Sequence, residues 1–554
     1  MPADGKWGPD CMCFVPGLGY CRPVRSEGSQ PPERVRAAEV IGALCLATDL
    51  GMGFPFEHGL HSTLIAARLA ERLGVDRETA SQTYYASLLS HAGCTTDAHV
   101  TYEVFGGSLT THLNPVMYGS AREVLGGLLR ALPDPNAPAV VRAVQIVGRA
   151  PRMARAQRPA LTATCEVAQM VAEGVGLPAS VHGLLGHVFE RWDGRGPLAR
   201  AKGEEISLPM RIVHVAVDAA FQWMLGGVER AARLIAERAG HAFDPEVAAC
   251  LARDAGEILA LDERVSAWEE TVGGEPSPPL ILEGEAIDRA LTVMGAFADL
   301  ISPFFTGHCA GVAELSQAAA QRCHLDLRSV TALRRASLVH DLGRVAVGAR
   351  TWQKPGPLSA DEWEQVRLHP YHTERILSRS RFLAALAATA GAHHERLDRS
   401  GYHRGCAGAE LAVPARLLAA ADAYHAMTEP RPHRPALSPE QAAETLAAQA
   451  SAGRLDPAAV AAVVAAAGQP VPRVELPAGL TDREMEVVGM LARGLQTKQV
   501  ARELGIAVKT ADRHVQNAYA KIGVSTRAAA TLFAMEHGLT VWGEHPIARA
   551  PDRT

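Results

Sequence analysis

Two adjacent residues, His340 and Asp341 in the segment ASLVHDLGR, offer a ring nitrogen and a carboxylate to metal ions from neighbouring positions. Further nitrogen and oxygen donors lie on both sides of this pair, namely His308, His369, His393, His394 and Asp422. Nitrogen and carboxylate ligands in this ratio suit Fe, Mn, Zn or Co rather than Ca or Mg. The alternative is that these histidines only satisfy hydrogen bonds inside a core. The joint occurrence of the whole set favours a metal centre.

The composition predicts that helices position these side chains. Of the 554 residues, 47% are hydrophobic and only 5% are aromatic, and long stretches are rich in Ala and Leu. Ala, Leu, Arg and Glu are good helix formers, whereas strands favour aromatic and β-branched residues. We therefore expect an all-α protein of roughly three domains, each with its own core, in which several helices of a bundle converge on the site.

Charge and apolar runs limit the functional classes. The formal net charge is −5, so any DNA contact must come from a local patch. No apolar run approaches the length of a transmembrane helix, and the N-terminus lacks the basic and apolar regions of a signal peptide. We expect a cytoplasmic protein without a membrane partner, whose cysteines are mostly reduced core residues.

Breaks in the helical pattern divide the chain into segments. We expect residues 1–30 to be a disordered leader, because they are rich in Gly and Pro without periodicity, and helical patterning follows over 31–272. The sequence GGEPSPP at 273–279 separates it from a second helical block at 280–468. The Pro-containing linker GQPVPRVELPAG then leads into a compact unit at 478–542.

The two helical blocks are diverged copies of one another. EHGLHSTLIAARLAERLGVD around His61 parallels TGHCAGVAELSQAAAQRCHLD around His308. YYASLLSHAG parallels RRASLVHDLG, FERWDGRGPL parallels HERLDRSGYH, and LPMRIVHVAVDA parallels VPARLLAAADA. We therefore expect tandem helical bundles.

The first copy has lost its metal ligands. Ser90-His91 stands where the second copy has the His-Asp pair, and Val188-Phe189 replaces the tandem histidines. Apolar side chains cannot bind metal, so we expect the first copy to sense a signal, to dimerise or to brace the second copy rather than to catalyse.

The second block resembles the HD-GYP subfamily of HD-domain phosphohydrolases over about residues 285–465. The motifs follow the family's order: the His-Asp pair, an HP dipeptide at His369, the tandem histidines, and Asp422 followed by RPHRPALS. The resemblance implies a metal-dependent phosphodiesterase that hydrolyses cyclic di-GMP, preceded by a degenerate HD domain.

The resemblance also implies a role for each ligand. His308, His340 and Asp422 would hold one divalent ion, His369, His393 and His394 would hold the other, and Asp341 would bridge the two. Iron and manganese are the expected metals, with zinc and cobalt as alternatives. A water between two positive charges would become nucleophilic, and the same charges would stabilise the phosphate as the diester opens.

Cationic residues are expected to clamp the substrate phosphates. Arg344 follows the His-Asp pair where the family usually has lysine, and its guanidinium keeps the charge and adds bidentate geometry. Arg431 and Arg434 match family positions that contact the substrate phosphates. The resemblance thus assigns the catalytic roles to Asp341 and Arg344.

Three departures from the family pattern bear on these expectations. The GYP triplet reads GYH at 401–403, which removes the proline that stiffens the loop. Thr373 replaces the glycine expected four residues after the HP histidine. Phe304 stands where trinuclear members carry a glutamate, which predicts two ions rather than three. The altered loop affects substrate identity and partner contacts more than hydrolysis.

The C-terminal unit resembles the LuxR/FixJ-type helix-turn-helix module over essentially its full length, from LTDREMEVVGML to RAAATLFAMEHGL. Thr481 or Asp482 caps a first helix, and Thr497 starts a short helix that stops at Gly505. After a tight turn, a longer helix spans about Val508–Ile522 within a four-helix domain.

In such a module the longer helix enters the major groove of double-stranded DNA. The expected DNA contacts are Thr497, Lys498 and Lys509, with Thr510, Arg513 and Asn517 as base readers. Val508, Val515, Ala518 and Tyr519 are expected to face the small core. The unit carries a net charge of only about +2, so we expect a homodimer that doubles the phosphate contacts. A helical interaction domain on the same scaffold is the alternative.

Three functions therefore remain open. The first is a cyclic di-GMP phosphodiesterase coupled to a DNA-binding transcription regulator. The second is a one-component transcription regulator whose HD site binds nucleotide or metal with little turnover. The third is an HD phosphohydrolase that acts on another nucleotide or phosphomonoester. The complete ligand set favours an enzyme, whereas the altered loop and the fused helix-turn-helix favour a receptor.

Overall fold

The computed structural model describes residues 34–94, 105, 113–262, 264, 266–406, 408–471, 477–492 and 494–536. Within these ranges the protein is almost entirely helical, and its sheet consists of two short antiparallel strands, β1 (Arg34–Arg36) and β2 (Ile281–Glu283). The all-α prediction is confirmed. The expected leader at 1–30 and the last residues of the C-terminal unit, 537–542, lie outside the described residues.

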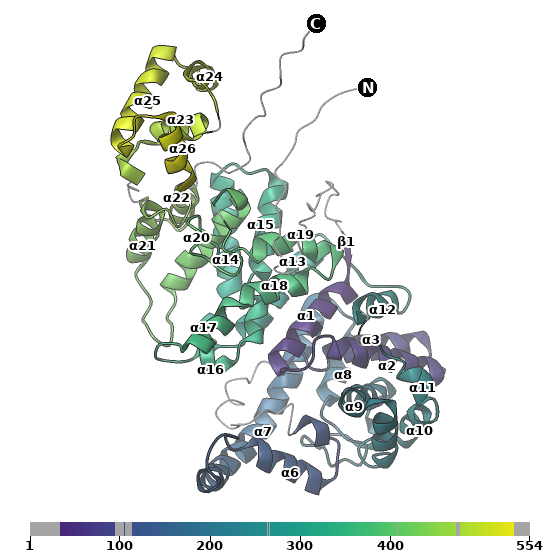
Figure 1. Ribbon diagram of the computed structural model, residues 1–554. Coiled ribbons are helices and arrows are strands. Elements are labelled where there is room, and N and C mark those ends of the chain that lie inside the picture. Colours follow the sequence, from purple (N-terminus) through teal and green to yellow (C-terminus); the bar gives the residue numbers. More distant parts are fainter. Residues whose placement is uncertain are drawn as a thin grey trace, which may run out of the picture.

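The first unit precedes β2 and is built from helices (Figure 1). Its elements are α1 (Ala37–Met52), α2 (His58–Arg72), α3 (Arg77–Leu89), η1 (Asn114–Val116), α6 (Ala121–Ala131), α7 (Ala139–Val175), α8 (Ala179–Leu184), η2 (Leu185–His187), η3 (Gly203–Glu205), α9 (Leu208–Glu237), α10 (Pro245–Arg253), α11 (Ala255–Ile258) and α12 (Ala267–Gly273).

The second unit follows β2 and contains the predicted metal ligands. Its elements are α13 (Glu285–Asp299), η4 (Pro303–Phe305), α14 (His308–Arg322), α15 (Leu327–Val339), η5 (Leu342–Ala346), α16 (Ala349–Trp352), α17 (Ala360–Arg367), α18 (His369–Leu377), α19 (Arg381–Ala390), η6 (Gly408–Glu410), α20 (Val413–Thr428), α21 (Pro439–Ser451) and α22 (Pro457–Ala466).

The two units begin one of their central helices in the same way. Helix α2 starts at His58 and helix α14 at His308, each directly after a residue with left-handed backbone, Glu57 (φ 76°) and Gly307 (φ 81°). The structural counterpart of His308 is therefore His58. This corrects the sequence comparison, which centred the parallel on His61.

A partly buried ion pair is also repeated in the two units. Arg211 of α9 lies 2.5 Å from Asp244, and Arg416 of α20 lies 2.9 Å from Asp456. Each aspartate caps the N-terminus of a helix that begins with proline, α10 in the first unit and α22 in the second. The same framework therefore supports both bundles, although their predicted site residues differ.

The first two units share their largest hydrophobic core. It combines apolar residues of α1, α3 and α7 with those of α13, α15 and α19. Helix α1 also packs on η5 and α18, next to the predicted metal ligands. At the edge of this joint the hydroxyl of Ser380 donates to Glu39 at 2.5 Å, and Arg379 lies 3.0 Å from Glu57. Each bundle also has a hydrophobic cluster of its own, as expected, so the shared core is an addition to the separate ones.

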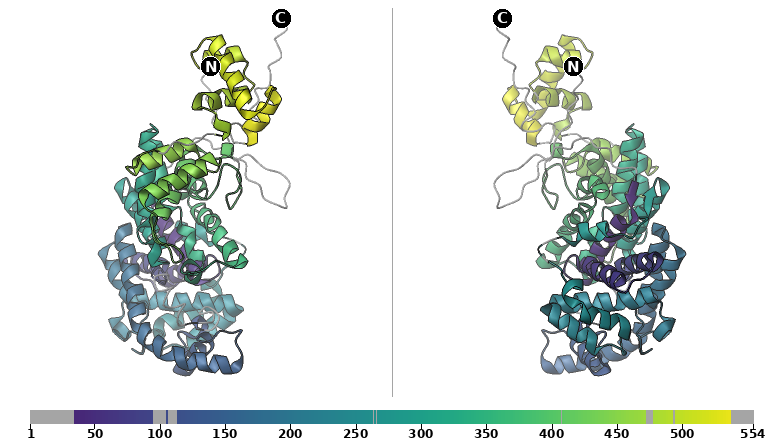
Figure 2. Two further views of the ribbon diagram at one scale, coloured as in Figure 1. Left: turned by 90° about the vertical axis from the view of Figure 1, so that its left-hand side faces the viewer. Right: turned by 90° about the vertical axis from the view of Figure 1, so that its right-hand side faces the viewer.

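The C-terminal unit consists of η7 (Pro477–Gly479), α23 (Asp482–Ala492), α24 (Thr497–Glu503), α25 (Val508–Ile522) and α26 (Arg527–Glu536). Its buried residues form two small clusters of their own. Thr481 and Glu484 exchange hydrogen bonds as a capping box, so Thr481 rather than Asp482 caps α23. Figures 1 and 2 show this unit at one end of the molecule and α6 at the other.

Along the described part of the chain, none of the helices combines the length and apolar character needed to span a bilayer. The described cysteines form no disulfide, as expected for reduced thiols, and Cys45, Cys165, Cys250 and Cys309 are buried.

Candidate metal centre

The predicted metal ligands converge in the second unit, mostly from helix ends. His308 and His369 are the first residues of α14 and α18, His340 and Asp341 join α15 to η5, His393 and His394 follow α19, and Asp422 lies within α20. The short elements let several backbone segments approach one point, which a single long helix could not do.

The carboxylate of Asp341 faces two different pairs of histidines. Its Oδ2 lies 3.0 Å from Nε2 of His340 and 3.4 Å from Nε2 of His308. Its Oδ1 lies 3.3 Å from Nε2 of His369 and 3.3 Å from Nε2 of His393. The residue is fully buried, and neither oxygen accepts a well-aligned hydrogen bond from the described residues. A buried carboxylate in this state fits a bridge between two cations.

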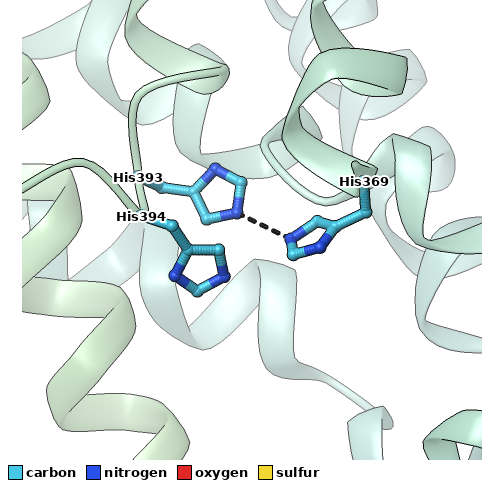
Figure 3. A group of neighbouring side chains, drawn as sticks. All are labelled: His369, His393 and His394. Carbon is cyan, nitrogen blue, oxygen red and sulfur yellow. Dashed lines mark hydrogen bonds between the residues drawn. The ribbon is translucent and has the colours of Figure 1, made fainter. Parts of the chain in front are cut away.

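The donor atoms separate into two groups around this carboxylate. His308, His340, Asp341 and Asp422 form one group, and His369, His393 and His394 form the other, with the donor atoms of each group within 4.8 Å of one another. Figure 3 shows the second group, in which the Nε2 atoms of His369 and His393 are 3.0 Å apart. Nδ1 of His394 also lies 3.7 Å from Asp422. The residues present therefore fit two transition-metal ions.

Hydrogen bonds to the backbone orient three of the histidine rings. In each of them Nδ1–H donates to the carbonyl three residues earlier at 2.6 Å: His340 to Ser337, His369 to Val366, and His393 to Ala390. Because a carbonyl can only accept, the proton is on Nδ1 and the lone pair of Nε2 points into the site.

Protons and metal ions would compete for these nitrogens. Burial by itself would lower the pKa of His308 and His340, but the carboxylates Asp341 and Asp422 raise these values to about 10 and about 9. Burial would likewise raise the pKa of Asp341, but Arg344 and the imidazoles hold it well below its usual range. Binding of ions must therefore displace protons from the first group.

Arg344 lies inside the site with two hydrogen-bond donors unused. Its Nη2 forms an ion pair with Oδ2 of Asp341 at 2.6 Å, and its guanidinium lies 4.2 Å from the ring centre of Phe305. Nε and Nη1 of this buried side chain have no partner among the described residues. These two donors can take phosphate oxygens without breaking the ion pair.

The other predicted phosphate ligands are held by the protein. Arg431 donates to the carbonyl of Phe304 at 2.7 Å and to Glu429 at 2.8 Å. Arg434 donates to carbonyls at the end of α20 and just beyond it, those of Ala426, Met427, Glu429 and Pro435. Both arginines thus fix the segment after α20.

Thr373, which departs from the family pattern, connects the His340–Asp341 turn to α18 by two hydrogen bonds. Its hydroxyl donates to the carbonyl of His340 and accepts the N–H of Gly343, both at 2.9 Å. A Cβ added at Gly343 would overlap the backbone of His369 and Thr373. This close approach of η5 and α18 brings His369 beside Asp341.

The loop at 401–403 is held without its proline. The buried carboxylate of Glu395 accepts the backbone N–H groups of Arg404 at 2.7 Å and Cys406 at 2.9 Å. A Cβ added at Gly401 would overlap the backbone of Glu395. The ring centre of Tyr402 lies 4.7 Å from that of His394, so the loop covers the second group of donors.

The sequence pattern did not single out His425 and Glu429. Oε2 of Glu429 lies 2.9 Å from Nδ1 of His308, and its Oε1 lies 3.2 Å from Nδ1 of His425. His425 follows Asp422 by three residues on α20, a spacing that places both on one helix face. This spacing is the signal that could have found it.

The first unit lacks an equivalent donor set. Gly93 lies against the carbonyl of Thr164 just as Gly343 lies against the carbonyl of His369, so Thr164 takes the place of that histidine. His58 is retained at the His308 position but is packed in the core, where burial lowers its pKa to about 3. Among the described residues of this unit, no cluster of donors could hold a metal ion.

The predicted DNA contacts lie on the surface of α24 and α25. Lys498, Lys509, Thr510, Arg513 and Asn517 are exposed, and Thr497 is partly buried. Val515 and Ala518 are buried as expected, and Tyr519 packs partly against the core. Val508 is 46% exposed, contrary to expectation, because the first residue of α25 precedes the face that packs on the core.

Two family models match the chain. Residues 293–459 match the model described as an HD domain, and residues 478–534 match bacterial regulatory proteins of the luxR family. The two matches cover the metal-ligand cluster and the C-terminal helices respectively.

Curated relatives include a 3'3'-cGAMP-specific phosphodiesterase 3 of Vibrio cholerae, 27% identical over 73% of this chain and 89% of that protein. The cyclic di-GMP phosphodiesterase response regulator RpfG of Xanthomonas campestris is 32% identical over 37% of this chain and 52% of that protein. A crystal structure of a cyclic GMP-AMP-specific phosphodiesterase from V. cholerae shares the fold, with a TM-score of 0.54 and 23% identity over 78% of this chain and 98% of that one.

The chain thus carries an HD domain related to cyclic dinucleotide phosphodiesterases, followed by a luxR-family domain.

Proposed function

We propose that residues 280–468 hydrolyse a cyclic dinucleotide with the help of two divalent transition-metal ions, and that residues 478–542 connect this reaction to DNA. The observation that carries the proposal is the buried carboxylate of Asp341, whose two oxygens face two separate histidine pairs. Burial of this carboxylate is costly, and Arg344 faces only its Oδ2, so a pair of bound cations would compensate the charge at both oxygens.

In this proposal the ligands act in the two groups described above. His308, His340 and Asp422 would hold one ion, His369, His393 and His394 would hold the other, and Asp341 would serve both. When bound, the two ions supply Lewis-acid activation of a water and stabilisation of charge on the phosphate. Iron and manganese are proposed first, and zinc or cobalt also suit these donors.

The chain's own residues orient the phosphodiester. Arg344 offers Nε–H and Nη1–H to phosphate oxygens while its Nη2 stays on Asp341. This fixes the phosphate beside the ions in the geometry that a guanidinium favours. Arg431 and Arg434 would contribute from the loop after α20 once the substrate displaces part of their present hydrogen bonds.

The proposed substrate is cyclic di-GMP or a related 3'3'-cyclic dinucleotide such as cGAMP, opened to the linear dinucleotide or to mononucleotides. The activities of these relatives support this class. The tandem copy at 31–272 would brace the active unit, because α1 packs on η5 and α18. In the C-terminal unit α25 would enter the major groove of DNA as part of a homodimer.

The proposal is tested with purified full-length protein loaded with Mn²⁺ or Fe²⁺ and supplied with cyclic di-GMP, 3'3'-cGAMP or a general phosphomonoester. Wild type should hydrolyse at least one cyclic dinucleotide, and Asp341→Asn should lose both metal ions and turnover. Asp361→Asn is the matched control, because Asp361 is an exposed aspartate of α17. Turnover of the monoester alone would contradict the substrate class.

A receptor role is the second candidate, favoured by the luxR-family domain on the same chain. There the site would bind the nucleotide and change DNA affinity with little turnover. Tight binding of cyclic dinucleotide without hydrolysis by the metal-loaded protein, together with a nucleotide-dependent shift in DNA binding, would select this function over the enzyme.

A further inference from the structure

The carboxylate of Glu429 is hydrogen-bonded to one of the proposed metal ligands. Glu429 directly follows α20, and its Oε2 accepts a hydrogen bond from Nδ1–H of His308 at 2.9 Å. Arg431 donates to the same oxygen at 2.8 Å, and Nδ1 of His425 lies 3.2 Å from Oε1. The carboxylate is therefore held from both sides by an imidazole and a guanidinium on Oε2 and by a second imidazole near Oε1.

His308 differs from the other ligating histidines in the acceptor of its Nδ1–H. His340, His369 and His393 donate to backbone carbonyls three residues earlier. His308 is the first residue of α14, directly after the left-handed turn at Gly307, and donates to the Glu429 side chain instead. One of the proposed ligands is thus supported by a negative charge rather than by a neutral carbonyl.

We propose that Glu429 is a positioning residue, which holds the ring of His308 with Nε2 directed at Asp341 and Asp422 and strengthens metal binding by that group. The inference rests on the proposed metal centre but is independent of the substrate. A carboxylate on the far nitrogen fixes the tautomer and raises the basicity of the ligating nitrogen. Removal of such a partner typically lowers metal affinity by about 10- to 100-fold.

The same residues could be taken for a third metal site, because donor atoms of His308, His425 and Glu429 lie close together. Two observations favour the supporting role. Nδ1 of His308 cannot ligate while it donates a proton to Glu429, and Nε2 of the same ring is directed at Asp422, 3.2 Å away. The guanidinium of Arg431 also lies 2.8 Å from Oε2 of Glu429, and its positive charge would repel a divalent cation.

The test measures Co²⁺ binding to metal-free full-length protein without any nucleotide. Wild type, Glu429→Gln, Glu429→Ala and His425→Gln are titrated in competition with a chromophoric chelator, and the visible absorption of bound Co²⁺ is recorded. Glu444→Gln is the control, since it removes the same charge from an exposed position of α21. The thermal midpoint of each metal-free variant checks the fold.

We expect two Co²⁺ equivalents in wild type. In Glu429→Gln the affinity of one equivalent should fall by about 10-fold and in Glu429→Ala by up to about 100-fold. The absorption of that equivalent should change, while the other equivalent, the control and the metal-free midpoints stay as in wild type. Gln keeps an oxygen acceptor, so the graded loss separates hydrogen bonding from charge.

Several results would overturn the inference. Unchanged affinity in Glu429→Ala, or equal weakening of both equivalents, would exclude a specific role at His308. Three equivalents in wild type that become two in His425→Gln would establish a third ion site instead. If wild type bound no Co²⁺, the metal centre itself would fail and this inference with it. Failure of cyclic dinucleotide hydrolysis alone would leave the Co²⁺ result standing.

Discussion

At the scale of single residues, histidine serves opposite purposes in the two bundles. In the second bundle, carboxylates around His308 and His340 raise their pKa values to about 10 and about 9. In the first bundle, His58 and His91 have no carboxylate partner among the described residues, and burial lowers their pKa values to about 3 and about 4. His308 and His340 thus hold protons in one copy, whereas His58 and His91 are neutral core residues in the other.

This difference predicts acid sensitivity that originates in the first bundle. The folded pKa of His58 lies below the unfolded value of about 6.5, so the unfolded state binds more protons and stability is lost as the pH falls from 6.5 towards 3. At pH 5 the contribution of His58 alone is about 2 kcal/mol. His58→Leu should reduce the loss of unfolding free energy between pH 7 and pH 5 by that amount, as measured by urea denaturation with a chelator present.

The control for this prediction is His241→Leu, which removes an exposed histidine of the same unit. This variant should retain the wild-type pH dependence of the unfolding free energy. An identical pH dependence in His58→Leu and wild type would show that His58 is not held neutral in the folded protein.

At the scale of elements, the site depends on short segments that approach closely rather than on long helices. The turn at His340–Asp341 sits against the start of α18 because Gly343 leaves room for the backbone and Thr373 hydrogen-bonds to both sides of the turn. In the C-terminal unit, by contrast, α25 offers one continuous exposed face to a partner.

Gly343→Ala should therefore separate η5 from α18. The added Cβ overlaps the backbone of α18, so relief of the clash must move Asp341 away from His369. We expect a loss of about 1–3 kcal/mol in unfolding free energy and weaker binding of the second ion. Gly348→Ala is the matched control, because a Cβ there meets no atom within 4 Å. Equal stability and metal content in the two variants would show that the close contact at Gly343 does not determine the position of Asp341 relative to His369.

The face of α25 predicts two separable effects on DNA binding. Arg513→Ala should lower affinity for a selected operator by about 1–3 kcal/mol and relax specificity, because Arg513 is proposed to read a base. Lys509→Ala should weaken binding to all sequences and reduce the salt dependence by about one unit of slope. The control Arg328→Ala removes the same charge from the surface of α15. It should change neither the affinity for DNA nor its salt dependence, as measured by fluorescence anisotropy titration.

At the scale of the whole molecule, the first two units share their largest core beside a smaller one in each, and the C-terminal unit has clusters of its own. Because α1 packs directly on η5 and α18, the first bundle contacts the elements that carry Asp341 and His369. A change in the first bundle can therefore reach the ligands through packed side chains.

Thermal unfolding should show this division as two transitions rather than three. We expect one large transition for the first two units together and a smaller one for the C-terminal unit. Saturating Mn²⁺ should raise only the large transition, by the equivalent of about 2.7 kcal/mol at a concentration of 100 Kd. Deletion of residues 472–554 should remove the small transition in calorimetry. A separate transition for the first unit would contradict the shared core.

Much of this organisation is already determined by the sequence. The helical class and the bounds of α25 follow from residue types and periodicity, which depend on local chemistry. The seven proposed ligands follow from residue types together with the resemblance to HD-GYP proteins. Only the tertiary structure shows that the two oxygens of Asp341 face two different histidine pairs, and that His58 occupies the position of His308 in the first unit. It also shows the shared core and the contacts of Thr373, His425 and Glu429 with the site. These features join residues far apart in the chain, and their distances depend on how helices pack rather than on any spacing along the sequence.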